Sequence, residues 1–149
     1  MVTTEQVKEL RDATGISVME CRKALVEAKG DREKALEILK KRSSAMAEKK
    51  SDRALGAGTV AAYVHANGTV GALVLLYSET DFVSKNEDFK KLAYDIAMHV
   101  AAMNPENEKE LLKQHYVKDP SQTVETLINN AIQKFGEKVE IGGFSRYSV

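Results

Sequence analysis

The chain has 149 residues, of which 43% are hydrophobic and 30% charged, a composition typical of globular proteins rather than disordered ones. Its formal net charge is zero, and its single cysteine, Cys21, excludes an internal disulfide. No apolar run reaches the roughly 18 residues of a membrane span, and the N-terminus lacks the pattern of a secretory signal, so we expect a cytoplasmic protein without membrane contacts.

Residues 1–42 are predicted to form three short helices. The residues that predict where these helices begin and end are Thr3 or Thr4, Gly15, Ser17 with Glu20, Gly30 and Asp31. In the second helix, apolar residues recur at spacings of three and four and so share one face: Val18, Cys21, Leu25 and Ala28. This segment resembles a ubiquitin-associated-type bundle, a kind of module that usually docks on other proteins.

Residues 43–56 carry many charges and few large apolar side chains, which predicts a solvated linker between residues 1–42 and a second domain at 57–149. Residues 1–53 contain 13 basic and 10 acidic side chains, and the rest of the chain contains 9 and 12. Neither balance is the clustered basic face that nucleic acids require, so we expect no direct contact with nucleic acid.

The second domain is predicted to be α+β, with a small antiparallel sheet packed against helices. Asn67-Gly68 lies between two apolar runs and predicts a hairpin whose two turn residues both tolerate positive φ. The second run, 71–77, is apolar nearly throughout, which predicts a strand covered on both faces. The remaining elements are a helix from Asn86 to Asn104-Pro105, a polar and helical connection, a helix that follows Pro120-Ser121 and ends at Gly136, and a last strand broken by Gly142-Gly143.

Catalytic and metal-binding patterns are absent from the sequence. His65, His99 and His115 have no helical metal-ligand spacing, and no phosphate-binding glycine loop occurs. Cys21 falls on an apolar helix face, where cysteine usually packs as a small hydrophobe. We therefore expect no metal, no cofactor and no enzymatic activity.

The segment Thr80-Asp81-Phe82-Val83 begins a predicted helix directly after the apolar strand. Thr80 can cap the helix, and Asp81 suits its positive N-terminal end. Phe82 has two interpretations. It either fills the core or stands exposed as an aromatic anchor for a partner, and the residues alone do not distinguish the two.

Four stretches of the chain resemble the bacterial elongation factor Ts family, whose members exchange the nucleotide of elongation factor Tu. They are VKELRDATGISVMECRKALVEAKGD, ETDFV, AMHVAAMNP and QHYVKDPSQTVETLINNAIQKFGEKVEI, in the family's order and over essentially the whole chain. ETDFV is the most specific of them. The resemblance implies a guanine-nucleotide exchange factor in translation elongation, with GDP-bound and nucleotide-free elongation factor Tu as its partner.

The resemblance also implies site residues. Thr80, Asp81, Phe82 and Val83 would form a wedge that enters between two helices of the partner's nucleotide domain and disturbs the magnesium and phosphate sites. Weaker candidates for partner contacts are Arg11, Thr14, Gly15, Ile16, Met19, Tyr63 and His65. For Ile16 and Met19, packing in the core is the other interpretation. For His65 it is simple exposure at a strand end, and for Met98 and His99 support of the core is favoured.

Two departures from the family pattern stand out. The connection at 106–115 replaces a longer helical segment, and Gly142-Gly143 replaces a basic pair. An exposed last strand could pair two copies as a homodimer. The alternative function is an adaptor protein whose helical bundle binds a partner helix, and such a protein would not accelerate GDP release.

Overall fold

The computed structural model describes residues 1–149, which form two compact units. The first unit comprises Met1–Asp52 with Thr126–Gly136, and the second comprises Arg53–Glu125 with Glu137–Val149. The first begins with three helices and the second is built on an antiparallel sheet with helices, so the predicted α+β fold is confirmed. None of the helices has the length and apolar character that crossing a bilayer requires.

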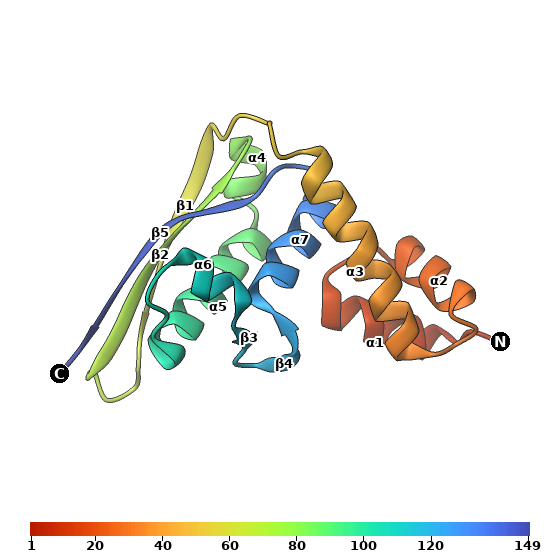
Figure 1. Cartoon of the computed structure of the whole chain (residues 1–149), viewed down its shortest axis with the longest axis horizontal. Helices are drawn as coiled ribbons and strands as arrows, with labels where there is room; N and C mark the ends of the chain where they lie inside the picture. Colours follow the sequence, from red (N-terminus) through yellow and green to blue (C-terminus); the bar gives the residue numbers. More distant parts are fainter. The chain divides into compact units, whose positions relative to one another are not determined.

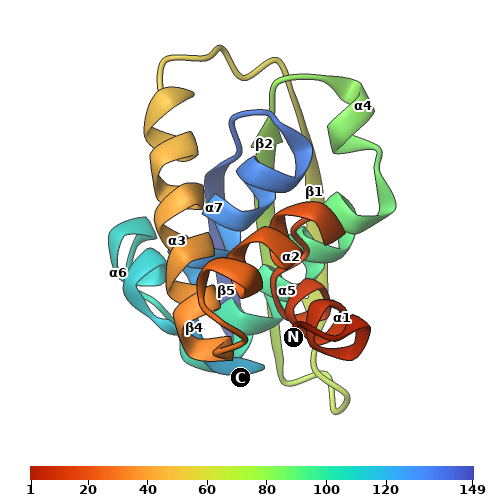
Figure 2. The ribbon, with the colours of Figure 1, turned by 90° about the vertical axis from the view of Figure 1, so that its right-hand side faces the viewer.

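The first three helices are α1 (Thr4–Thr14), α2 (Val18–Glu27) and α3 (Arg32–Lys49). Each begins where the sequence predicts, because a short polar side chain accepts a backbone N–H of the first turn: Thr3 from Gln6, Ser17 from Glu20 and Asp31 from Lys34. Gly15 ends α1 in the left-handed conformation, with φ of 71°. Figure 2 shows these helices in red to orange.

The core of the bundle is apolar. It consists of Val7, Leu10, Ile16, Cys21, Ala24, Leu25, Ala28, Ala35 and Leu39. Val18, predicted to share the inner face of α2, is 52% exposed. The buried face of α2 consists instead of Cys21, Ala24 and Leu25. The apolar face that packs in the core therefore begins one turn into the helix.

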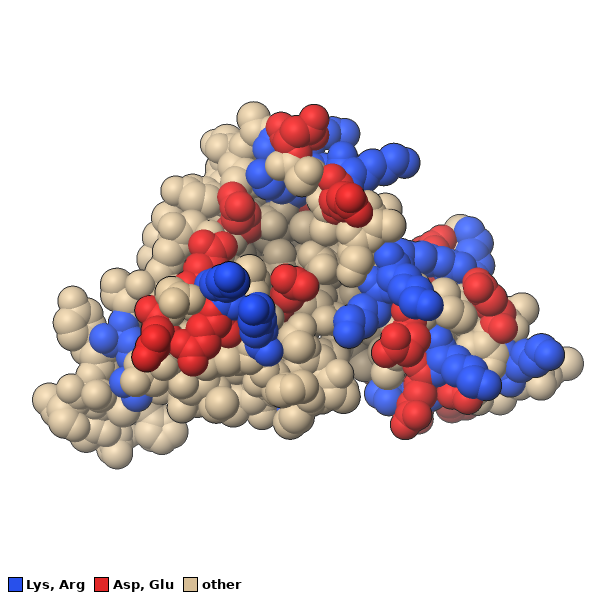
Figure 3. All heavy atoms as spheres, in the orientation of Figure 1, with Lys and Arg blue, Asp and Glu red and all other residues tan.

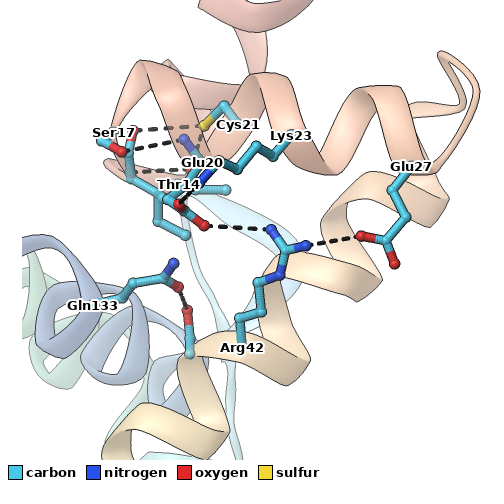
Figure 4. Close-up of polar contacts among 10 residues, drawn as sticks. Thr14, Ser17, Glu20, Cys21, Lys23, Glu27, Arg42 and Gln133 are labelled. Carbon is cyan, nitrogen blue, oxygen red and sulfur yellow. Dashed lines mark hydrogen bonds and ion pairs between the residues drawn. The ribbon is translucent and has the colours of Figure 1, made fainter.

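Helix α3 continues past residue 42 to Lys49 because its later part also packs. Ser43 is buried, and its hydroxyl donates to Oε1 of Gln133 at 2.6 Å, a contact drawn in Figure 4. Gln133 lies in α7 (Val124–Phe135), most of which belongs to the first unit. The division at 1–42, 43–56 and 57–149 stays a prediction, and the sequence pattern did not indicate that a late helix joins the N-terminal unit.

The second unit is built on a three-stranded antiparallel sheet of β1 (Ala57–Val64), β2 (Val70–Ser78) and β5 (Glu140–Ser148), in the order β1-β2-β5. The predicted hairpin is confirmed, and its loop closes with the His65 N–H donating to the Val70 carbonyl at 2.8 Å. Of the two predicted turn residues, only Gly68 takes a positive φ. Asn67 accepts hydrogen bonds from the N–H and hydroxyl of Thr69 instead, which stabilises a longer loop than a two-residue turn.

The last strand passes through Gly142-Gly143 without a break. Leu75 pairs with Gly143 and Leu76 with Ile141, so Gly142 is the extra residue of a β-bulge. A Cβ atom at Gly142 would collide with the ring of Tyr77. The glycine is therefore required by the close approach of that ring.

The helices of the second unit lie on one side of its sheet (Figure 1). Helix α5 (Glu87–Met103) begins at the predicted cap Asn86, packs against β1 and β2, and ends at Asn104. The other side of the sheet is open, and Val60, Val64, Leu73 and Tyr147 are exposed there. The prediction that β2 is covered on both faces is thus wrong for the single chain.

The polar connection after α5 is partly helical, as predicted. It holds α6 (Glu108–Lys113) and a two-stranded sheet of β3 (His115–Tyr116) and β4 (Asp119–Thr123). This small sheet is fastened to α5 by the buried His99. Its Nδ1 accepts the Val117 N–H at 3.1 Å, and its Nε2 lies 2.9 Å from Oε1 of Gln114. Nδ1 is thus the acceptor, so the proton is on Nε2 and donates to Gln114, and the ring is neutral.

Burial lowers the pKa of His99 below its usual 6.5, which predicts acid sensitivity. The unfolded chain takes up the proton more readily than the folded one, so the stability contributed by neutral His99 is present above about pH 6.5. It is lost as the pH falls from there towards the lower folded-state pKa. Urea unfolding at several pH values should show this loss in the native chain, and His99→Gln should reduce it because glutamine can serve both partners without titrating.

His65 provides the matched control, because it is exposed and lies in the hairpin loop. His65→Gln should keep the acid sensitivity of the native chain. If His99→Gln and the native chain lose the same stability between pH 7.5 and 5.5, then His99 does not carry the effect.

Candidate functional site

Phe82 stands out from the surface of the second unit. It belongs to α4 (Asp81–Ser84), a single helical turn directly after β2, and its side chain is 92% exposed. Asp81 beside it is exposed as well. Of the two interpretations that the sequence left open, the structure excludes the core, and Phe82 is available to another molecule.

The other half of the turn faces inward. Val83 and Ser84 are buried, and the Ser84 hydroxyl donates to the Asp81 carbonyl at 3.3 Å. Val83, a predicted contact residue, therefore anchors the turn in this structure and does not present its side chain to solvent. One turn of helix thus fixes Val83 on the inside and Phe82 on the outside.

Thr80 occupies the N-cap position of α4, but its side chain makes no capping bond. The hydroxyl donates instead to Oε2 of Glu137 at 2.6 Å, and the Thr80 N–H donates to Oε1 of the same carboxylate at 3.0 Å. The prediction that the Thr80 side chain caps the helix is therefore wrong. A tertiary partner competes for the hydroxyl.

Sequence reasoning missed the acidic residues that hold this turn. Glu79 accepts the Lys138 N–H at 2.6 Å and pairs with Arg53 at 3.3 Å, while Glu137 binds the backbone of Glu79 and Thr80. Glu79 and Glu137 lie in two of the stretches that resemble the family, ETDFV and the closing segment. No local pattern, however, indicates that the Glu137 carboxylate accepts the backbone N–H of Glu79, which lies 58 positions earlier in the chain.

The N-terminal candidates gather around the end of α1 and the start of α2. Met19 is 65% exposed and Arg11 is exposed, whereas Ile16 is 1% exposed and packs in the bundle core. The expectation that Ile16 faces a partner is therefore corrected, and its core interpretation holds. Thr14 is partly buried because its hydroxyl donates to the Leu10 carbonyl at 2.8 Å and accepts the Ile16 N–H at 3.2 Å.

Cys21 lies beneath this loop. Its Sγ donates to the Ile16 carbonyl at 3.6 Å and contacts the Thr14 hydroxyl (Figure 4). Burial raises the pKa of the thiol, so little thiolate forms at neutral pH, and thiolate is the nucleophilic form. The environment of Cys21 is that of a packed side chain.

Tyr63 and His65 form a pair at the end of β1. The Tyr63 hydroxyl lies 3.0 Å from Nδ1 of His65, and the Tyr63 ring meets the edge of Tyr94 from α5 at a centroid distance of 5.7 Å. Both line a hollow of about 460 Å³ together with Met98 and Val117. Tyr63 therefore supports the sheet and helix, and His65 is the exposed member of the pair.

The chain is similar to known proteins along nearly its whole length. The model of the family "Elongation factor TS" matches residues 79–149, which include the exposed turn and Glu137. Elongation factor Ts of Acetivibrio thermocellus is 41% identical to the chain, with 99% of this chain and 89% of the relative covered. Elongation factor Ts of Syntrophus aciditrophicus is 40% identical (99% and 96%), and that of Thermotoga neapolitana 39% identical (99% and 97%).

These alignments extend over 192, 193 and 191 positions, more than the 149 residues of this chain. The relatives therefore carry residues within the matched span that this chain lacks. The identity nevertheless covers both units and nearly the whole length of each relative. The chain belongs to the elongation factor Ts family.

Proposed function

We propose that this chain, as a member of the elongation factor Ts family, accelerates GDP release from elongation factor Tu by inserting Phe82, with Asp81, between two helices of the partner's nucleotide domain. Family membership makes the chain a nucleotide exchange factor for elongation factor Tu in translation elongation. The observation that carries the wedge is that a large aromatic side chain is 92% exposed on a turn whose inner half is buried. Such a side chain gains its burial only in a complex.

Differential binding is the physical basis of the exchange. The exchange factor binds the nucleotide-free partner more tightly than the GDP-bound one. Linkage then requires that the exchange factor lower the partner's affinity for GDP by the same ratio. Docking Phe82 fully would contribute ~2–3 kcal/mol, and each 1.4 kcal/mol changes an equilibrium or a rate about tenfold. The wedge alone is therefore large enough to change GDP release by one to two orders of magnitude.

The chain acts by contact and makes or breaks no covalent bond itself. We place it in the cytoplasm, where translation occurs, and assign it no direct contact with nucleic acid. In support, Lys and Arg side chains are interspersed with Asp and Glu on the face seen in Figure 3, without a continuous basic patch.

The remaining candidates would add affinity rather than displace nucleotide. On the first unit they are the exposed Arg11 and Met19 and the loop of Thr14 and Gly15. On the second unit they are His65 and, behind it, Tyr63. These contacts lie on both units. This fits an exchange factor whose helical unit docks on the partner and whose sheet unit displaces the nucleotide.

Stopped-flow release of a fluorescent GDP from elongation factor Tu tests the proposal directly. Addition of this protein should accelerate release in proportion to its concentration until saturation. An adaptor, the alternative function, would bind the partner and leave the release rate unchanged.

The open face of the sheet is the basis for proposing a second copy as an additional partner. Its outward residues are Gly58, Val60, Ala62, Val64, Gly71, Leu73, Leu75, Tyr77, Glu140, Gly143, Ser145 and Tyr147. Glu140, at one end of the face, is the only charged residue among them, whereas the solvated face of a half-covered sheet is ordinarily polar. Two copies of such a largely uncharged face are self-complementary around a two-fold axis.

Sedimentation velocity tests this homodimer. The native chain should sediment as a dimer at micromolar concentration, and Leu73→Lys should give a monomer because it would bury two unpaired charges. Val26→Lys is the control, since Val26 is exposed on α2 and belongs to the first unit rather than to the sheet. A native chain that stays monomeric over the accessible concentration range would contradict the proposal.

A further inference from the structure

The turn that carries Phe82 is held by one carboxylate from a distant part of the chain. Glu137 accepts the N–H groups of Glu79 and Thr80 on Oε1, at 3.1 and 3.0 Å, and the Thr80 hydroxyl on Oε2 at 2.6 Å. The Glu79 carboxylate in turn accepts the Lys138 N–H at 2.6 Å and forms an ion pair with Arg53. We call Glu79, Thr80 and Glu137 with these bonds the carboxylate clamp.

The turn needs such a clamp because little else orders it. Helix α4 has four residues, too few to be stable by itself, and the Thr80 side chain does not cap it. Phe82, the largest side chain of the turn, is exposed and contributes almost no packing. Hydrogen bonds to a charged acceptor are stronger than neutral ones, so Glu137 is well suited to fix the backbone just before Asp81 and Phe82.

The clamp also joins the turn to both places where the chain enters the second unit. Arg53 is the first residue of that unit, and Glu137 is the residue with which the chain returns to it after the helix of the first unit. Each is bonded to Glu79 or Thr80. The clamp thus gathers the start of the unit, the return of the chain and the turn in one hydrogen-bonded cluster.

From this geometry we infer that Glu137 is a positioning residue for nucleotide exchange, which holds the turn so that Phe82 is presented before the partner arrives. The inference rests on the proposed wedge. Ordering a flexible anchor during binding costs free energy that a preorganised anchor does not lose. Loss of the clamp should therefore lower the efficiency of the wedge and leave the docking contacts of the helical unit intact.

Three substitutions of Glu137 separate its hydrogen bonds from its charge. Glu137→Ala removes all three bonds, and Glu137→Asp shortens the side chain so that it no longer reaches the turn. Glu137→Gln keeps an oxygen for the two N–H groups, and its amide can donate to the Thr80 hydroxyl oxygen. We expect Ala and Asp to lower the maximal rate of stimulated GDP release about five- to tenfold, with less than about a twofold change in the half-saturating concentration, and Gln to retain most of the native rate.

A double-mutant cycle with Phe82 shows whether Glu137 acts through the wedge. In a Phe82→Ala background, adding Glu137→Ala should lower the maximal rate of stimulated GDP release by less than about twofold, because the side chain that Glu137 positions is already absent. An equal loss in both backgrounds would overturn the inference, since Glu137 would then act independently of Phe82. Glu140→Ala is the control, because it removes a carboxylate that lies three positions further on and outside the clamp. This variant should stimulate GDP release at the native rate.

The outcomes distinguish the clamp from the wedge itself. If Phe82→Ala alone leaves exchange unchanged, the proposed wedge fails. If Phe82→Ala slows exchange and Glu137→Ala does not, only the positioning role fails. Circular dichroism should confirm that each variant is folded, and if Glu137→Ala does not fold, the difference between the Asp and Gln variants makes the same comparison.

Discussion

Replacement of Phe82 by alanine is expected to slow stimulated GDP release by one to two orders of magnitude, the rate equivalent of roughly 1.5–3 kcal/mol. The same substitution should change the free energy of unfolding by no more than about 0.5 kcal/mol, because the side chain is 92% exposed and leaves no cavity when it is removed. Stopped-flow release of fluorescent GDP gives the first quantity, and urea unfolding followed by circular dichroism gives the second.

Asp81→Ala should act in the same direction but more weakly, with a small loss of stability because Asp81 lies in the first turn of α4. Both variants must be assayed as folded proteins. A Phe82→Ala chain that unfolds at a much lower temperature while each folded molecule exchanges nucleotide normally would show that Phe82 has a structural role and no role as a wedge.

Replacement of Phe89 by alanine should have the opposite effect to Phe82→Ala and lower stability rather than activity. It should reduce the free energy of unfolding by about 3–5 kcal/mol. Phe89 lies seven residues after Phe82, on the first turn of α5, but it is completely buried. Its removal leaves a large cavity, because Phe89 is among the largest fully buried side chains of the chain. Since single domains are stable by only about 5–15 kcal/mol, the melting temperature should fall steeply.

Exchange per folded Phe89→Ala molecule should stay near the native value, measured below the melting transition and corrected for the folded fraction. The pair therefore separates two roles of one residue type, with activity lost in Phe82→Ala and stability lost in Phe89→Ala. Equal stability losses in the two variants would contradict the burial that the structure assigns to them.

Local chemistry was sufficient to predict much of this fold. Thr3, Ser17, Asp31 and Asn86 cap helices where the sequence places them, because a side-chain oxygen satisfies N–H groups only a few residues ahead. The Asn67-Gly68 hairpin is local in the same sense. Resemblance then supplied the family, through motifs whose order and coverage the comparisons confirm.

The tertiary structure decided what depends on residues far apart in the chain. Phe82 and Phe89 have similar local patterns, and only the packed sheet and helix show that one is outside and the other inside. The same holds for Ile16, which is buried by its neighbours in the bundle, and for the open face of β2. Burial is set by which elements pack together, and periodicity gives only the faces that are available.

The carboxylate clamp shows this limit most clearly. Glu79 and Glu137 both read as solvated acidic residues, since each is charged and lies next to the end of an element. They become partners of the turn only because the chain brings residues 137–138 beside the end of β2. The sequence by itself determined the helices, the hairpin and the motif that contains Phe82, because these depend on neighbouring residues. Only the tertiary structure decided that Phe82 is exposed and that Glu137 holds it there, because both facts depend on contacts between segments that the sequence keeps far apart.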